Sequence, residues 1–169
     1  MRRENRATLA GVSLPAVLAL ALALTLPLTF PRAATGSATT VHQHTLKGTE
    51  VPPISSTLGT FVGVATGGLP ATWRVQIAHQ PLATGPTVAI TGGTFSLLTA
   101  RGHKVGGPVS SGSVTVTNRG AHCTDQTYQV TLAFGSGSFA GTLTHHRHSI
   151  LGRCILYSAT IRGLGSFTT

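Results

Sequence analysis

The stretch Thr127-Tyr-Gln-Val-Thr-Leu-Ala-Phe134 decides the fold class of this chain. Every second side chain from Tyr128 to Phe134 is apolar or aromatic, and the side chains between them are polar except for Ala133. Successive side chains of a β-strand point to opposite faces of the sheet, so this pattern predicts a strand with one dry face and one wet face. Such half-buried strands are typical of antiparallel sheets.

The same alternation recurs along the chain, between turns rich in Gly and Pro. It is clear at residues 73–79, 113–117 and 155–162, and further strands are expected at residues 41–46, 58–65, 87–98 and 138–145. Gly92-Gly93 predicts a β-bulge, which curves a sheet. Seven or eight short strands predict an all-β fold: a single small antiparallel β-barrel, with a two-sheet β-sandwich as the alternative. Glycines within the strands favour the barrel, because closure requires strong coiling.

An apolar segment precedes the predicted strands. Three arginines in the first six residues are followed by a stretch without charge from Ala7 to Pro31, and then by small residues. This order is that of a secretory signal peptide, so we predict a signal peptide helix within residues 1–38, an extended arm with a possible first strand at 39–56, and the barrel at 57–169. Residues 9–30 are also long enough to be an uncleaved membrane anchor. Either interpretation places the barrel outside the cytoplasm, secreted or membrane-tethered.

Charge is strongly unbalanced beyond residue 38. This part of the sequence contains eight Lys and Arg residues but only two acidic residues, Glu50 and Asp125. The basic residues are scattered, whereas a nucleic-acid-binding protein more often has a clustered basic stripe. The composition therefore argues against nucleic acid as a partner and indicates attraction to an anionic cell-surface polymer. A membrane would be a partner only through the N-terminal segment, if that segment stays uncleaved.

The chain has two cysteines, Cys123 and Cys154. In an oxidising compartment an even pair normally forms a disulfide. We therefore expect a Cys123–Cys154 bond.

The run Gly135-Ser-Gly-Ser-Phe-Ala-Gly-Thr-Leu-Thr144 resembles the glycine-rich strand of the allene oxide cyclase and dirigent β-barrel families. The runs at residues 59–63 and 93–95 likewise place glycine close to an aromatic residue. The resemblance implies a barrel fold of about eight strands. No catalytic or substrate-binding residue of these families matches a position in this chain.

Two histidines are in phase with apolar strand faces, each at the far end of its face. His79 follows the face that carries Trp73, and His145 follows the face of Phe139 and Leu143. In a barrel these histidines would lie at a mouth, with Tyr157 on another inward face. Aromatic side chains with a few polar groups are typical of a small-ligand pocket, so the predicted ligand-binding residues are Trp73, His79, His145 and Tyr157.

Two further histidine pairs have metal-ligand spacing. His42 and His44, and likewise His146 and His148, are two residues apart on a strand, so that both side chains of a pair project to the same side. Two such pairs on neighbouring strands would offer four nitrogen ligands to zinc or copper. The alternative is that His42 and His44 lie in a solvated arm.

Motifs of enzymes and cofactor-binding proteins are missing from the sequence. There is no Gly-x-Ser-x-Gly elbow and no phosphate or calcium loop, and Asp125 is interpreted as a turn residue before the strand near Thr127. We therefore predict no catalytic residue and no cofactor. The leading hypothesis is a secreted, non-enzymatic barrel that binds a small apolar ligand or a cell-surface component. The alternatives are a barrel-type isomerase or cyclase, and a metal-binding surface protein.

Overall fold

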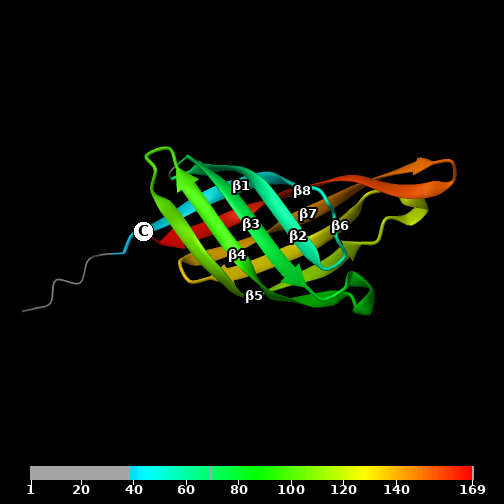
Figure 1. The fold of residues 1–169 in the computed structure, drawn as a ribbon, viewed down its shortest axis with the longest axis horizontal. Helices are drawn as coiled ribbons and strands as arrows, with labels where there is room; N and C mark the ends of the chain where they lie inside the picture. The colour runs from blue at the N-terminus through cyan, green and yellow to red at the C-terminus, as the bar shows by residue number, and fades with distance from the viewer. Residues whose placement is uncertain (1–38, 69, 169) are drawn as a thin grey trace, which may run out of the picture. The chain divides into compact units, whose positions relative to one another are not determined.

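A computed structural model describes residues 39–68 and 70–168, all within one compact unit. The predicted signal peptide, or anchor, lies outside the described residues. Eight strands follow one another with two short 3₁₀ turns, η1 (Leu82–Thr84) and η2 (Ala121–Cys123) (Figure 1). The strands are β1 (Val41–Glu50), β2 (Leu58–Gly67), β3 (Ala71–His79), β4 (Thr87–Thr99), β5 (Lys104–Asn118), β6 (Gln126–Phe134), β7 (Gly137–Ile150) and β8 (Arg153–Thr168).

The strands close into an antiparallel barrel. Each strand pairs with the next one in the chain, and β8 pairs back with β1 through a register that runs from Val41 opposite Thr168 to Thr49 opposite Thr160. The prediction of a barrel rather than a sandwich is confirmed, with eight strands. All of the pairing lies within residues 41–168, so this part of the chain contains everything that closure requires.

Alternating side chains fill the barrel. In β6 the inward residues predicted from the sequence are all buried, with Val130 only 1% exposed. Near one end, the ring of Phe95 stacks on those of Phe134 and Phe167 at centroid distances of 4.4 and 5.2 Å. Twenty-one apolar residues form this core, which runs from Leu46 to Phe167.

Glycine is required where neighbouring strands approach closely. A Cβ atom at Gly63 would collide with the carbonyl group of Lys47 on β1. At Gly92, by contrast, a Cβ atom would meet nothing within 4 Å. The predicted bulge is confirmed here, because Ala78 of β3 lies opposite Gly92 whereas His79 lies opposite Ile90.

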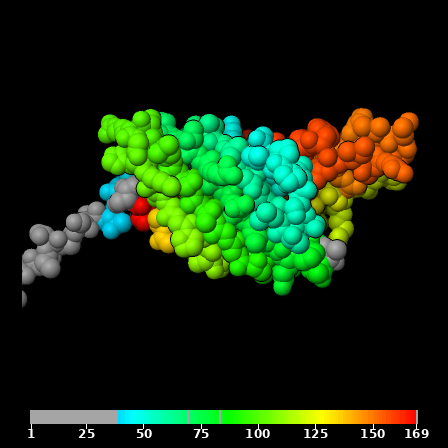
Figure 2. Space-filling view, viewed as in Figure 1, coloured from blue at the N-terminus to red at the C-terminus, as the bar shows by residue number. Residues whose placement is uncertain are grey.

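Three segments differ from the sequence-based expectation. The first strand is not part of an arm, because Val41–Glu50 pairs on both edges and completes the barrel. Strand β5 begins at Lys104, inside a segment whose glycines and proline suggest a turn. Strands β7 and β8 continue past the barrel as a long hairpin that projects from the body of the molecule (Figures 1 and 2).

The predicted disulfide is confirmed. Cys123 in η2 is bonded to Cys154 in β8, which ties the loop before β6 to the projecting hairpin. In the part of the chain that the structure describes, no helix has the length and apolar character needed to cross a membrane.

Candidate functional site

The two ends of the barrel carry different chemistry. We call them the Glu50 end, where β1, β3 and β5 finish, and the Arg101 end, where the β4–β5 hairpin and the end of β8 lie. At the Glu50 end a carboxyl group and an imidazole face each other inside the barrel. The side chains of Glu50 and His145 are 3% and 12% exposed, and Glu50 Oε2 lies 3.9 Å from His145 Nε2. This separation is too long for a hydrogen bond, and Glu50 Oε2 has no hydrogen-bond partner.

Burial holds both groups in their neutral forms. It raises the pKa of Glu50 to about 7. It also lowers the pKa of His145 to about 4, with smaller Coulombic contributions from His79, His146 and Arg147. Between these two values the site contains a protonated carboxylic acid beside a neutral imidazole. One group can then donate a proton and the other can accept one.

His145 connects this buried pair to the outside. A void of about 20 Å³ is lined by Glu50, His79 and His145, and an open cleft of about 420 Å³ is lined by Tyr128 and by His145 again. The rings of Tyr128 and His145 meet edge to face at 5.0 Å, and the Tyr128 hydroxyl donates a hydrogen bond to Gln126 Oε1 at 2.9 Å. The cleft is within the size range of small-ligand sites.

The four predicted ligand-binding residues do not lie together. His79 and His145 both line the Glu50 end, as expected for a mouth. Trp73 is buried in the barrel wall, where its Nε1–H donates to the carbonyl of Val64 at 3.1 Å. Tyr157 is 64% exposed and faces outward, so its predicted inward orientation is wrong. The reason is an irregularity in β8, where Ser158 pairs with His146 but Leu156 pairs with Arg147, leaving Tyr157 without a partner.

Glu50 and Tyr128 belong to this site, although they were not among the predicted binding residues. A signal for both was present in the sequence. Glu50 is in phase with the inward residue Leu46 of the same strand, and Tyr128 is in phase with Val130. Their proximity to His145 could not be inferred, because it depends on which strands are neighbours.

The interior of the barrel has little free space. Besides the void at Glu50, a second void of about 10 Å³ lies beside Trp73 and Phe95. One water molecule needs roughly 10–15 Å³ of such volume. Neither of these two voids therefore has room for a small apolar ligand.

The two histidine pairs lie at opposite ends of the barrel. His44 is opposite Gly165 of β8 and His146 is opposite Ser158, a separation along β8 of about 23 Å at 3.3 Å per residue. His44 is buried against Phe167, and burial, followed by the charge of His42, lowers its pKa. Among the described residues no three His, Cys, Asp or Glu side chains are grouped to hold a metal ion. A four-histidine site is therefore not assembled within the described chain, and metal binding by either pair alone stays a prediction.

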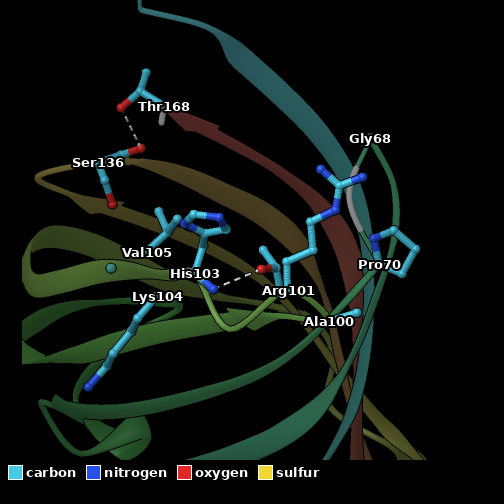
Figure 3. Close-up of a pocket in the computed structure, with 11 residues that line it drawn as sticks. Gly68, Pro70, Ala100, Arg101, His103, Lys104, Val105, Ser136 and Thr168 are labelled. Carbon is cyan, nitrogen blue, oxygen red and sulfur yellow. Dashed lines mark hydrogen bonds between the residues drawn. The ribbon is translucent and has the colours of Figure 1, made fainter.

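The Arg101 end has the larger hollow, a pocket of about 750 Å³. Its lining includes Arg101, His103 and Lys104 of the β4–β5 hairpin together with Ser136 and Thr168, and the Lys104 side chain points away from the other four (Figure 3). The hairpin is tightened by a hydrogen bond from the His103 backbone N–H to Thr99 Oγ1 at 3.1 Å. None of the described lining residues carries a carboxylate, so the pocket suits an anion.

Among the described residues, only one carboxyl group, that of Asp125, is an exposed anion on the outer surface. Glu50 is buried and its pKa is about 7, whereas Asp125 accepts hydrogen bonds from His146 and from the backbone of Arg147.

No protein-family model, curated protein or solved structure matches the chain.

Proposed function

We propose that this protein is an exported barrel that binds an anionic cell-surface component, with the pocket at the Arg101 end as its binding site. One observation supports the proposal above all: the basic residues Arg101, His103 and Lys104 are among the residues that line a pocket of about 750 Å³, and its described lining has no carboxylate. The Cys123–Cys154 disulfide is consistent with an extracellular location. Because the voids in the interior are small, a ligand would bind from outside the barrel.

The rest of the surface supports the same interpretation. Lys47, Arg74 and Arg162 are exposed on the barrel wall, whereas Glu50 is buried and Asp125 is the one exposed carboxylate of the described residues. A polyanion is therefore attracted at long range by the whole molecule and held at short range by the pocket. Such an interaction weakens as salt concentration rises, because mobile ions screen exposed charges.

The test compares two double variants of residues 39–169 that lose the same charge. Arg101→Gln/Lys104→Gln alters the pocket, and Arg119→Gln/Arg153→Gln alters exposed positions at the opposite end. Binding of polygalacturonate is measured by calorimetry at low and high salt, with dextran as the neutral polymer. Two surface ion pairs of up to about 1 kcal/mol each make the expected loss roughly tenfold in Kd for the pocket variant. The control variant should lose about twofold or less. Equal losses in both variants, or equal binding of dextran, would contradict the proposal.

A barrel-type isomerase or cyclase is a second candidate, and the Glu50–His145 pair is the observation that favours it. A neutral acid and a neutral base next to a cleft of about 420 Å³ can move a proton on an apolar carbonyl compound. Its test is deuterium exchange next to the carbonyl of small cyclic ketones in D₂O. Exchange should be lost in Glu50→Gln and His145→Gln, and exchange no faster in the wild type than in buffer would remove this candidate.

A further inference from the structure

A chain of three hydrogen-bonded side chains lies on the outer wall, outside both end sites. His146 Nδ1 lies 2.8 Å from Asp125 Oδ2, and His146 Nε2 lies 2.9 Å from Thr160 Oγ1. The other carboxylate oxygen of Asp125 accepts the backbone N–H of Arg147 at 3.2 Å. The three groups come from the loop after η2, from β7 and from β8, so the fold brings together segments that are distant in sequence.

The hydrogen-bond partners fix the tautomer of a neutral His146. The bonds from His146 and from the Arg147 backbone hold the pKa of Asp125 below its ordinary value, so Asp125 is a carboxylate that can only accept. The Nδ1 atom therefore carries the proton and donates it to Asp125. The Nε2 lone pair then accepts the hydroxyl proton of Thr160. A general base polarised by a carboxylate and hydrogen-bonded to a hydroxyl is the arrangement that activates an alcohol as a nucleophile.

The position of this carboxylate is built into the fold. Arg147 Nη1 donates to the carbonyl of Arg119 at 3.3 Å, and the Cys123–Cys154 bond ties η2 to β8. Both interactions attach the loop that carries Asp125 to the base of the hairpin. A rigid orienting acid is what a base of this kind requires.

The surroundings of Thr160 suit an anionic chain. Arg162 follows two residues later on the same outer face of β8, and its cross-strand partner on β1 is Lys47; both are exposed. On the other side, the exposed ring of Tyr157 lies 6.1 Å from that of His146. Thr160 thus shares the outer face of β8 with Arg162, Lys47 lies across from Arg162, and Tyr157 lies beside the base His146. A polymer can lie along such a surface without entering a pocket.

We propose that Asp125, His146 and Thr160 form an esterase site that removes acyl groups from an anionic polymer. The Thr160 oxygen attacks the ester carbonyl carbon while its proton passes to His146 Nε2. The ester C–O bond then breaks, and the same proton goes to the departing alkoxide, leaving an acyl group on Thr160. Water hydrolyses this ester, aided by the same base, and releases a carboxylic acid.

The first experiment measures hydrolysis of p-nitrophenyl acetate, which does not depend on the proposed binding function. Thr160→Ala and His146→Ala should each lower the rate about 100-fold, the usual contribution of a positioned nucleophile or base, whereas Thr160→Ser should retain activity. Two controls are matched to the site. His148→Ala removes another imidazole of β7, and Thr144→Ala removes the hydroxyl of the cross-strand partner of Thr160; neither should change the rate. A thermal melt of each variant shows that the barrel is intact.

The second readout is covalent. After an acid quench, peptide mass spectrometry should find the acetyl group on Thr160 in the wild type and not in His146→Ala. An acetyl group found only elsewhere, or hydrolysis by Thr160→Ala at the wild-type rate, would overturn the proposal. The substrate class, which rests on the proposed function, is tested separately by acetate release from acetylated polygalacturonate. A protein that hydrolyses p-nitrophenyl acetate through Thr160 but not this polymer would retain the site and lose the assignment of its substrate.

Discussion

Replacing Glu50 by Gln tests the electrostatics of the Glu50 end through the pH dependence of stability. The pKa of Glu50 is about 7 in the folded barrel, against an ordinary value of 4.5. The folded state therefore holds its proton more tightly than the unfolded state. The resulting stabilisation is fully present below pH 4.5 and is lost as pH rises to about 7. Since a pKa displaced by one pH unit corresponds to about 1.4 kcal/mol, the loss amounts to about 3 kcal/mol.

His145 contributes with the opposite sign. Its pKa is about 4 in the folded state, against an ordinary value of 6.5, so the unfolded state binds the proton more tightly. Stability then increases by about 3 kcal/mol as pH rises from 4 to 6.5. In the wild type the two contributions nearly cancel over this range, and each becomes visible only when the other group is removed.

The assay is urea denaturation at half-unit intervals from pH 4 to pH 8, expressed as the free energy of unfolding of each variant minus that of the wild type. For Glu50→Gln this difference should rise by about 3 kcal/mol between pH 4.5 and 7. For His145→Gln it should fall by a similar amount between pH 4 and 6.5. Asp125→Asn checks the sign in additional melts below pH 4. The carboxyl pKa of Asp125 is lowered from its ordinary value of 3.8 by the hydrogen bond from His146, so the difference should become less favourable as pH rises towards 3.8 and should stay constant above it.

A flat difference curve for Glu50→Gln would refute the reasoning, because it would mean that the folded barrel solvates this carboxyl group as water does. A curve of the opposite slope would mean that Glu50 is ionised and paired with a protonated His145. The neutral pair, and with it the isomerase candidate, would then be wrong.

The remaining predictions concern the scaffold. Cys123→Ser/Cys154→Ser should lower the free energy of unfolding by about 3 to 4 kcal/mol, because the disulfide closes a loop with a sequence separation of 31. The wild-type protein with its disulfide reduced should have the same stability as this double variant. A loss below about 1 kcal/mol would contradict the prediction. Gly63→Ala should cost at least about 2 kcal/mol in urea melts, because its Cβ would strike the Lys47 carbonyl, whereas Gly92→Ala should change stability by less than about 1 kcal/mol. Equal effects of the two alanines would show that the strand spacing at Gly63 is not limiting.

Tertiary structure was needed for every functional contact described above. The sequence offers Asp125 as a turn residue and His146 as half of a metal pair, and both interpretations miss that these side chains meet across 21 residues of chain. Thr160, which lies 14 residues beyond His146, has no sequence signal that separates it from the other threonines of the strands. Glu50 and His145 likewise meet only because β1 and β7 both pair with β8.

The sequence by itself determined the existence of the strands, most of their inward faces and the disulfide of this protein. Side-chain alternation is a local property of an extended backbone, so residues 127–134 revealed their strand and its buried face without knowledge of any neighbour. The glycines within the strands favoured closure of the sheet, and the even number of cysteines indicated their pairing. The register between strands could not be inferred from the sequence, because it depends on bulges and on partner strands far away in the chain. One unpaired residue in β8 turned Tyr157 outward, and the pairing of β7 with β8 placed His146 beside Thr160.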